Sequence, residues 1–523
     1  MNERDDNEVF EQTHVWMVSL TVMMASIMSA IDTTIVNVAL PYMRGNLGAS
    51  IEEISWVSTG YILSSVVMMP IMGFLTARFG RRNFFIFCVA LFTVTSMLCG
   101  LAWNLESLIF FRIVQGIGGG ILLPISQAIL RETFPPKQQG LAMGLYGMGV
   151  VIGPAVGPLI GGWLTDNYSW PWIFFINIPI GIVNLFLAAK YLKDPSYLVR
   201  EKSKMDWTGL ALLATGIGAF QLFLEKGESK GWFDSGFIIR LLIIAVVTIS
   251  FFVWRELKAQ KPMVNLRILK DRNFFCGSII GAVFGFCLYG TLFIQPLFLQ
   301  QLGYTSFGTG QILVPRSIAM AFSMPLAGRL YNRLGARNII WIGLAITICS
   351  YWQFAHLSLT VTGKDLFIPQ ILQGFGFGLI FVAISTVALA TIEKPVMTEA
   401  VGLYNVIRQL FSSIGIAVAA TLLTNGESRY RSVLVEHVTS YSTATTQWLA
   451  TATEAFKHKG LDLFSAHKGA LALLDQEINR QAQMLSFNSI FAIMSIIFLV
   501  SGLLVFILRE SKSSEEAEVP LEV

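Results

Sequence analysis

The sequence has few charged residues and few of the side chains that form metal or disulfide sites. Only 13% of its 523 residues are Asp, Glu, Lys or Arg, about half the share found in soluble domains. The five histidines are scattered, and the five cysteines lie at unrelated spacings inside apolar runs, which fits neither a disulfide framework nor a zinc site. No Gly-x4-Gly-Lys-Ser/Thr segment exists, which excludes a P-loop ATPase. We therefore expect no enzyme active site, metal, cofactor or nucleic-acid partner.

The chain is instead rich in long apolar runs, each close to the length that crosses a bilayer. About 20 apolar residues span the hydrocarbon core as a helix, because a helix satisfies its own backbone groups. Fourteen runs qualify, and the first is too long, with too acidic a flank, for a cleaved signal peptide. The fold class expected is an all-α polytopic membrane protein with fourteen transmembrane helices. The runs cover residues 16–40, 54–75, 83–103, 107–130, 140–164, 171–192, 206–225, 237–256, 274–299, 308–331, 338–359, 366–391, 399–424 and 486–508.

Basic residues follow alternate runs and so predict the orientation. They occur at residues 78–82, 190–204, 255–272 and 329–337, whereas the short loops on the other side carry only Arg44, Lys226, Lys230, Arg240 and Lys364. Positively charged loops stay in the cytoplasm, so we expect both termini to be cytoplasmic.

Three segments of the first half recur in the second half, in the same order. Gly73, Arg78 and Gly80 recur 255 positions later as Gly328, Arg333 and Gly335. Gln115-Gly116 and the Gly144-Leu-Tyr146 segment recur 258 positions later as Gln373-Gly374 and Gly402-Leu-Tyr404. The pattern predicts two homologous six-helix halves with two helices inserted between them, and a substrate path between halves that rock against each other.

Five motifs carry a resemblance to a known family. They are the basic loop at 73–82, the Arg112 segment at 108–116, the Gly/Pro segment at 153–162, and the segments at 31–41 and 172–181. In these the chain resembles the major facilitator superfamily, and more closely its fourteen-helix drug:proton antiporters, the EmrB-like group. Two positions depart from the family pattern: the usual Asp of the basic loop is Ala77, and Asn332 in the second copy. Any charge-relay role of this loop is therefore not expected.

The resemblance implies a major facilitator fold and its domain limits. Two six-helix bundles are expected at 16–192 and 271–508, joined by a linker at 193–270 that carries the two inserted helices. Residues 1–15 and 509–523 are the cytoplasmic tails, and 425–485 is an extracytoplasmic loop. From Phe464 to Leu485 apolar residues recur at helical spacing, which predicts an amphipathic helix. That helix could rest on the membrane, cap its own transporter or, as the resemblance implies, dock a periplasmic adaptor that leads to an outer-membrane channel.

Asp32 is the candidate proton-coupling residue, because it is the one acid deep inside an apolar run. It lies roughly 24 Å along the helix from Trp16, and carboxylates at such depth pair, titrate or face a cavity. Arg112 lies at similar depth, and the resemblance ties its position to proton transfer. A static ion pair or a structural hydrogen bond explains the same residues without a proton cycle.

Arg316 and Arg408 are candidates for binding anionic substrates, because neither has an acidic residue nearby in its own run. Bonds to helix-end carbonyls are the structural alternative. Polar and aromatic residues within the runs complete the candidate substrate set, which comprises Asn37, Gln115, Tyr146, Tyr289, Gln295, Arg316, Tyr404 and Arg408.

Glycines form the remaining candidate motifs. Gly153, Gly157, Gly161 and Gly162 share one helix face with Pro158 nearby, and small residues allow close helix packing. The resemblance implies that they form a sealed, flexible contact between the halves. The loop motif comprises Gly73, Arg78, Gly80 and Arg81.

The function expected is proton-driven export of amphipathic compounds, including anionic ones, from the bacterial inner membrane by alternating access. The proton gradient is the expected energy source. A proton-coupled importer of a small organic solute and a non-transporting membrane scaffold are the alternatives.

Overall fold

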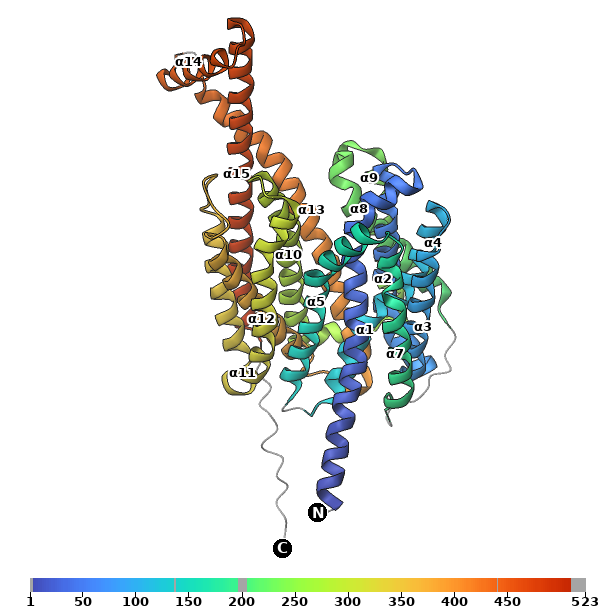
Figure 1. Cartoon of the computed structure of the whole chain (residues 1–523). Coiled ribbons are helices and arrows are strands. Elements are labelled where there is room, and N and C mark those ends of the chain that lie inside the picture. The colour runs from blue at the N-terminus through green and yellow to red at the C-terminus, as the bar shows by residue number, and fades with distance from the viewer. Residues whose placement is uncertain (1–2, 136–137, 196–204, 440, 509–523) are drawn as a thin grey trace.

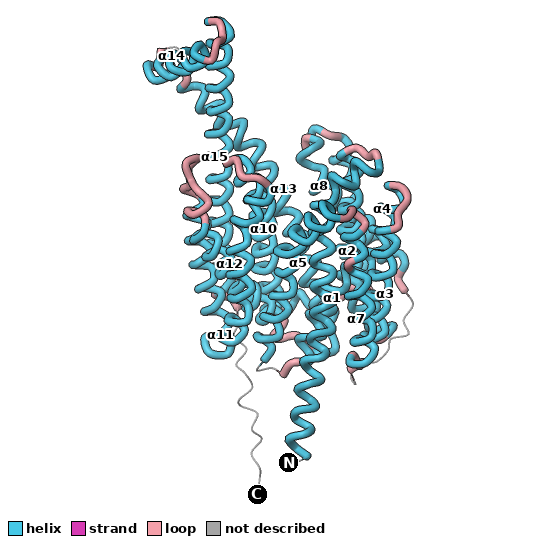
Figure 2. The backbone as a smooth tube through the Cα atoms, viewed as in Figure 1, coloured by secondary structure: helices cyan, strands magenta, loops and turns pink. Residues whose placement is uncertain are grey.

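The computed structural model describes residues 3–135, 138–195, 205–439 and 441–508, and in this part of the chain every regular element is helical. Figures 1 and 2 show the long helices standing upright and side by side. We call the face on which α1 begins the lower face and the opposite face the upper face (Figure 1). The elements are α1 (Glu3–Leu47), α2 (Ile51–Phe79), α3 (Arg81–Gly100), α4 (Leu105–Thr133), α5 (Gln139–Asn167), α6 (Trp172–Phe175), α7 (Asn177–Tyr191), α8 (Trp207–Gly227), η2 (Glu228–Lys230), η3 (Trp232–Asp234), α9 (Gly236–Lys258), η4 (Leu266–Lys270), α10 (Arg272–Gln301), α11 (Ser306–Phe354), α12 (Phe367–Ala388), η5 (Lys394–Val396), α13 (Met397–His437), α14 (Thr443–His458) and α15 (Leu463–Val505).

Thirteen helical segments of the described chain are long and apolar enough to cross a membrane, and together they account for all fourteen predicted runs. The difference in number arises in α11, where Gly335 has φ 76 and divides one continuous element into two spans. Its repeat partner Gly80 has φ 84 and separates α2 from α3. Both positions need the left-handed backbone that glycine adopts at little cost. The repeated glycine thus makes the tight turn between the second and third helix of each half.

Polar N-caps fix where several helices begin. Ser50 and Glu53 form a capping box at the start of α2, and Asn104 and Ser107 form one at the start of α4. Asp271 accepts the Phe274 N–H at the start of α10. These side chains satisfy backbone donors that would otherwise be unpaired.

The helices pack as two bundles with an inserted pair beside them. Helices α1 to α5 and α7 pack on one another, as do α10 to α13 and α15. Helices α8 and α9 pair with each other, and α8 also contacts α2 of the first bundle and α13 of the second. The outer surface is apolar: α9 exposes Ile243, Val246, Val247 and Phe251. Such a surface is compatible with lipid rather than water, and the chain is a multi-pass membrane protein of the predicted fold class.

Two symmetric pairs of helices, α2 with α13 and α5 with α11, make the main contacts at the seam between the bundles, where α4 also contacts α13 and α5 also contacts α12. The repeated glycines lie at these crossings. A Cβ on Gly144 would lie 2.7 Å from the Met324 carbonyl oxygen, and one on Gly402 would lie 2.6 Å from the Met69 carbonyl oxygen. A Cβ on Gly73 would lie 2.9 Å from Glu399 Cα, and one on Gly328 would lie 2.9 Å from Leu141 Cα. These distances are too short for a side chain, so glycine permits the close approach of backbones.

The segment at 425–485, expected as a loop with one amphipathic helix, is helical over most of its length. Helix α13 continues to His437, α14 covers Thr443–His458, and α15 begins at Leu463 and runs without a break into the last span. Figure 1 shows these helices projecting beyond the upper face. Contacts between the extended helices include Arg431 to Asp475 at 2.8 Å and Gln483 to Glu427 at 2.7 Å. The amphipathic helix predicted from Phe464 is present, but it extends the last span upward and is not a separate surface helix.

Candidate functional site

Asp32 lies in a buried polar cluster between three helices of the first bundle. Asp32 of α1, Arg112 and Gln115 of α4 and Asn177 of α7 are each at most 1% exposed. Arg112 Nη1 donates to Asp32 Oδ2 at 2.6 Å, while the amides of Gln115 and Asn177 donate to Asp32 Oδ1, each at 3.1 Å. Every side chain in this set except the carboxylate presents a donor. Three donors from two other helices therefore converge on the Asp32 carboxyl oxygens.

Arg112 is held by more than its ion pair. Its Nε donates to the Val57 carbonyl of α2 at 3.1 Å, and its guanidinium carbon lies 4.2 Å from the centre of the Tyr61 ring. The same Nη1 also donates to Gln115 Oε1 at 2.8 Å. A buried ion pair is favourable only with such additional bonds, since both charges are removed from water. Through these bonds Arg112 of α4 contacts both α1 and α2.

Other polar side chains of α1 join this cluster only in part. The Ser29 hydroxyl lies 3.3 Å from the Tyr61 hydroxyl and donates to the Gly119 carbonyl at 3.1 Å. Thr33 donates to the Ser29 carbonyl within α1. Asn37, a candidate substrate residue, is exposed and accepts from Ser58 at 3.0 Å. The structure thus separates Asn37 from the Asp32 cluster.

The second bundle carries a corresponding buried cluster without a carboxylate. Arg316 Nη1 donates to Gln295 Oε1 at 2.5 Å, Gln295 donates to Gln373 at 3.0 Å, and Gln370 donates to Gln295 at 3.4 Å. By the repeat, Gln373 corresponds to Gln115, Gln370 to Arg112 and Arg316 to Tyr61. The first cluster is an ion pair and the second is a cation held by amides. Two candidate substrate residues, Gln115 and Gln295, therefore lie inside these clusters.

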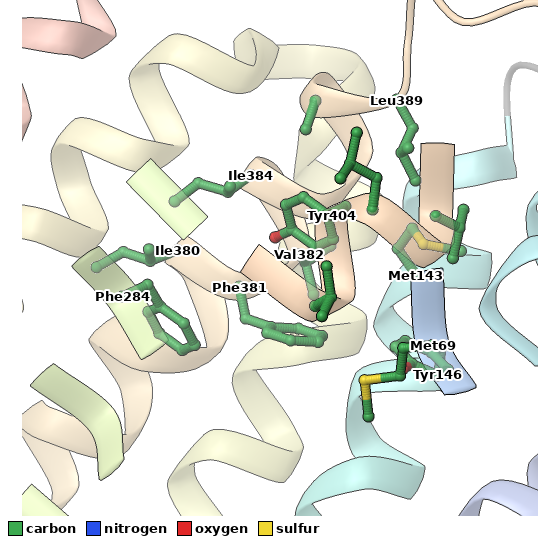
Figure 3. Close-up of a cluster of buried hydrophobic side chains, with 14 of the residues drawn as sticks. Met69, Met143, Tyr146, Phe284, Ile380, Phe381, Val382, Ile384, Leu389 and Tyr404 are labelled. Carbon is green, nitrogen blue, oxygen red and sulfur yellow. The ribbon is translucent and has the colours of Figure 1, made fainter. Parts of the chain in front are cut away.

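Arg408 lies at the seam among aromatic side chains. Its Nη2 donates to Asn405 at 2.8 Å, and Asn405 in turn donates to Gln127 of α4 at 2.7 Å. Its guanidinium lies 5.4 Å from the Phe381 ring centre and 5.9 Å from that of Tyr404. The phenols of Tyr146, Tyr289 and Tyr404 are its electrostatic neighbours. In Figure 3, Tyr146 and Met69 of the first bundle lie near Phe381 and Tyr404 of the second. Four of the candidate substrate residues are thus brought together.

The helix 5 glycines do share one face, but the expectation that they join the two halves is wrong. A Cβ on Gly153 would lie 2.5 Å from Ala30 Cβ, and one on Gly161 would lie 2.8 Å from Ile35 Cγ1. Gly157 likewise faces Thr34, while the nearest atom to Gly162 is 4.0 Å away. All these neighbours belong to α1 of the same bundle, and Pro158 is exposed. The contact between the halves is made lower on α5, at Gly140 and Gly144.

The loop motif lies at the lower ends of α2 and α3. Gly73 packs against Glu399 of α13, Gly80 makes the turn, and Arg81 pairs with Glu132 of α4 at 2.8 Å. Arg78 lies over the Phe79 ring. The motif therefore joins α2 to α13 and α3 to α4, a structural role that needs no acid at position 77.

Three further buried residues, in these clusters or at the seam, are not in the candidate set drawn from the sequence. Asn177 lies within a recognised motif, yet its amide bonds both Asp32 and Ser96. Tyr61 is one aromatic among many, and only the fold shows that Arg112 lies over it. Arg131, 2% exposed, crosses the seam and donates to the Thr386 carbonyl of α12 at 3.1 Å. Because Arg131 lies at the end of a span, its position in the sequence does not indicate this contact.

Comparisons with known proteins agree with this geometry. The model of the Major Facilitator Superfamily matches residues 22–416. The chain is 37% identical to the fatty acid resistance protein FarB of Neisseria gonorrhoeae over 486 residues, which cover 92% of this chain and 94% of that protein. It is 32% identical to the multidrug export protein EmrB of Escherichia coli K12 over 94% of both chains. Among solved structures it resembles the human organic anion transporter MFSD10 (TETRAN), with a TM-score of 0.58 and 14% identity over 92% of this chain and 99% of that one, a likeness of fold alone.

Proposed function

The chain belongs to the Major Facilitator Superfamily, and from that premise we propose that it is a proton-coupled exporter of amphipathic compounds, including anionic ones. The relatives named for multidrug export and fatty acid resistance align over more than nine-tenths of the chain. The observation that carries the proposal is the buried ion pair of Asp32 with Arg112 in the first bundle.

The coupling follows from the charge balance of that pair. When Asp32 is ionised, Arg112, Gln115 and Asn177 all donate to it and hold α1, α4 and α7 together. When Asp32 is protonated, the cluster carries an uncompensated positive charge, which is costly in a low-dielectric interior. The two protonation states therefore favour different helix arrangements, and the difference is transmitted to the seam because Arg112 also bonds α2. Substrate binding at the seam favours the state that releases the proton.

The proposal includes an orientation in the membrane. The basic segments at 78–82 and 329–337 belong to the turns around Gly80 and Gly335, and positive charge favours the cytoplasmic side. We therefore assign the lower face and both termini to the cytoplasm. The location is the bacterial inner membrane, where the proton gradient drives export.

An adaptor protein is the proposed partner of the upper projection, formed by the end of α13, α14 and the start of α15. The projection exposes Leu463, Phe464 and Leu471, and apolar side chains far above a bundle favour contact with another protein. An adaptor there would connect the exporter to an outer-membrane channel.

The test uses purified protein in liposomes with an imposed pH gradient. Wild-type protein is expected to accumulate a fluorescent amphipathic drug against its gradient, and Asp32→Asn is expected to lose gradient-driven accumulation while remaining folded. Accumulation of a solute in the same direction as the proton flux would support the importer. The absence of both solute and proton flux in the wild type would support the scaffold.

A further inference from the structure

The inserted pair α8–α9, with the turns η2 and η3 that join it at the upper face (Figure 1), is hydrogen-bonded to both bundles. Three of these bonds connect it to α13 of the second bundle. They run from Gln221 to the Ser413 hydroxyl at 3.0 Å, from the Trp232 indole to the Thr421 hydroxyl at 2.9 Å, and from the Thr424 hydroxyl to Glu228 at 2.9 Å. The inserted pair therefore follows the upper half of α13.

The same segment makes a second set of polar contacts, with the first turns of α2 in the first bundle. These run from Lys226 to the Ser55 hydroxyl at 3.1 Å, from Lys230 to Glu52 at 3.3 Å, and from the Thr59 hydroxyl to the Glu225 carboxylate. The inserted pair thus spans from one bundle to the other at the upper face, away from the glycine crossings of the lower seam.

The contacts with α13 are buried and closely packed. Gln221 and Ser413 are 5% and 9% exposed, and beside them Phe223 and Leu224 of α8 form an apolar cluster with Ala417 of α13. Close packing of apolar side chains is the main attraction between helices in a membrane, and a buried hydrogen bond there has no water to replace it. We therefore expect these contacts to persist when the bundles move.

The contacts with α2 are of the opposite kind. Lys230 and Glu52 are 45% and 78% exposed, and Glu225 is also exposed. Exposed ion pairs are weak and exchange readily with water. The contacts with α2 can therefore break and re-form at little cost, whereas those with α13 cannot.

The α2 contacts lie next to the Asp32 cluster. Thr59, which bonds Glu225, comes two residues after Val57, whose carbonyl accepts from Arg112. One stretch of α2 is therefore held by Arg112 from inside the first bundle and by the inserted pair from outside it. A shift of α2 relative to α4 must change its contacts with α8.

We propose that α8 and α9 move as part of the second bundle and form a releasable strap on α2 of the first. The contacts with α2 exchange as the bundles rock, while those with α13 remain. This inference rests on the proposed transport by alternating access, and it assigns the two inserted helices to one of the moving bodies. It also gives them a role, which is to connect the helix that bonds Arg112 to the second bundle.

The first test cross-links each side of the strap in turn. Cys349, the one exposed cysteine among the described residues, is replaced by serine. Two pairs of cysteines are then introduced, Ser55→Cys with Lys226→Cys between α2 and α8, and Thr424→Cys with Glu228→Cys between α13 and the strap. Each pair replaces two side chains that are hydrogen-bonded in the structure, so the pairs are matched. Each variant is treated in liposomes with a short reducible bis-thiosulfonate cross-linker, and drug transport is followed before and after reduction.

Cross-linking to α2 should abolish transport and reduction should restore it, because the bundles can no longer change their arrangement. Cross-linking to α13 should leave transport unchanged, because it joins parts of one moving body. Continued transport with the strap cross-linked to α2 would overturn the proposal. A block by the α13 cross-link would also overturn it, because the inserted pair would then move relative to the second bundle.

The second test needs neither drug nor proton. Spin labels are placed at Phe237 at the start of α9, at Ile51 of α2 and at Val433 of α13, which are 48%, 71% and 47% exposed. Distances are measured with and without Gly328→Val, which forces side-chain atoms into the lower seam. The distance from Phe237 to Ile51 should change, while that from Phe237 to Val433 should not. A change in both distances, in the second alone or in neither would overturn the strap. Failure of proton coupling in the Asp32 experiment would leave these distances as they are, so the two proposals fail separately.

Discussion

Gly153→Ala tests whether the α5 glycines pack against α1. The added methyl would lie 2.5 Å from Ala30 Cβ and from the Ala30 carbonyl carbon. Alanine favours a helix interior over glycine by about 1 kcal/mol, whereas forcing a methyl into a packed contact costs about 1–3 kcal/mol. The same backbone contact includes the bond from the Thr34 hydroxyl to the Gly153 carbonyl at 3.0 Å. The difference between this cost and this gain is a net destabilisation of up to about 2 kcal/mol.

Gly162→Ala is the matched control, since it lies on the same helix and its added methyl would have no atom closer than 4.0 Å. At Gly162 only the higher helix propensity of alanine affects stability, because the added methyl makes no close contact. The variant should therefore be as stable as the wild type or more stable by up to about 1 kcal/mol. The assay is thermal unfolding of both purified variants in the same detergent, with Tm followed by tryptophan fluorescence. A Tm for Gly153→Ala equal to or above that of Gly162→Ala would refute the proposed packing.

Three further predictions follow from other contacts. Arg112→Gln removes the positive charge that favours the ionised form of Asp32, so the carboxyl should retain its proton. Drug-induced proton release, measured with a pH dye, should therefore fall, and release equal to that of the wild type would contradict this reasoning. Gly328→Val places side-chain atoms against Leu141 and should open the seam at the lower face. The opening should increase thiol labelling of a cysteine placed at Ala142. The control Gly310→Val, where an added Cβ has no atom within 4 Å, should leave this labelling unchanged. Arg431→Ala breaks a bridge whose partners are 48% and 52% exposed, so unfolding should become easier by at most about 1 kcal/mol; a larger loss of Tm would show that the upper projection depends on that pair.

The parts of the fold that could be predicted depend on signals along the chain. Apolar length alone identified the spans, because the bilayer imposes a minimum on each helix. The repeat paired Gly80 with Gly335 and Gly144 with Gly402, and the structure explains each pair. Gly80 and Gly335 both have a positive φ, whereas Gly144 and Gly402 both lie where two helix backbones cross closely. Asp32 and Arg112 could be selected because buried charge is rare. Their partnership across 80 residues is a property of the fold.

Other features could not be predicted because they depend on which helices are neighbours. A glycine face indicates close packing but does not name the opposite helix, and this is why Gly153 was assigned to the wrong contact. The hydropathy pattern ends after Thr424 because polar residues follow it, yet those residues are compatible with a helix that leaves the membrane, and α13 continues to His437. Arg131 lies at a span end, where arginine is common, and only the packing of α4 on the second bundle shows that it bonds Thr386.

Proton release on drug binding, measured with purified protein in weakly buffered detergent solution, tests the central claim most directly. The account predicts that the wild type releases protons when an amphipathic drug is added and that Asp32→Asn binds the drug without releasing any. Equal proton release by Asp32→Asn would show that another group carries the proton, and the Asp32–Arg112 cluster would then be a structural ion pair.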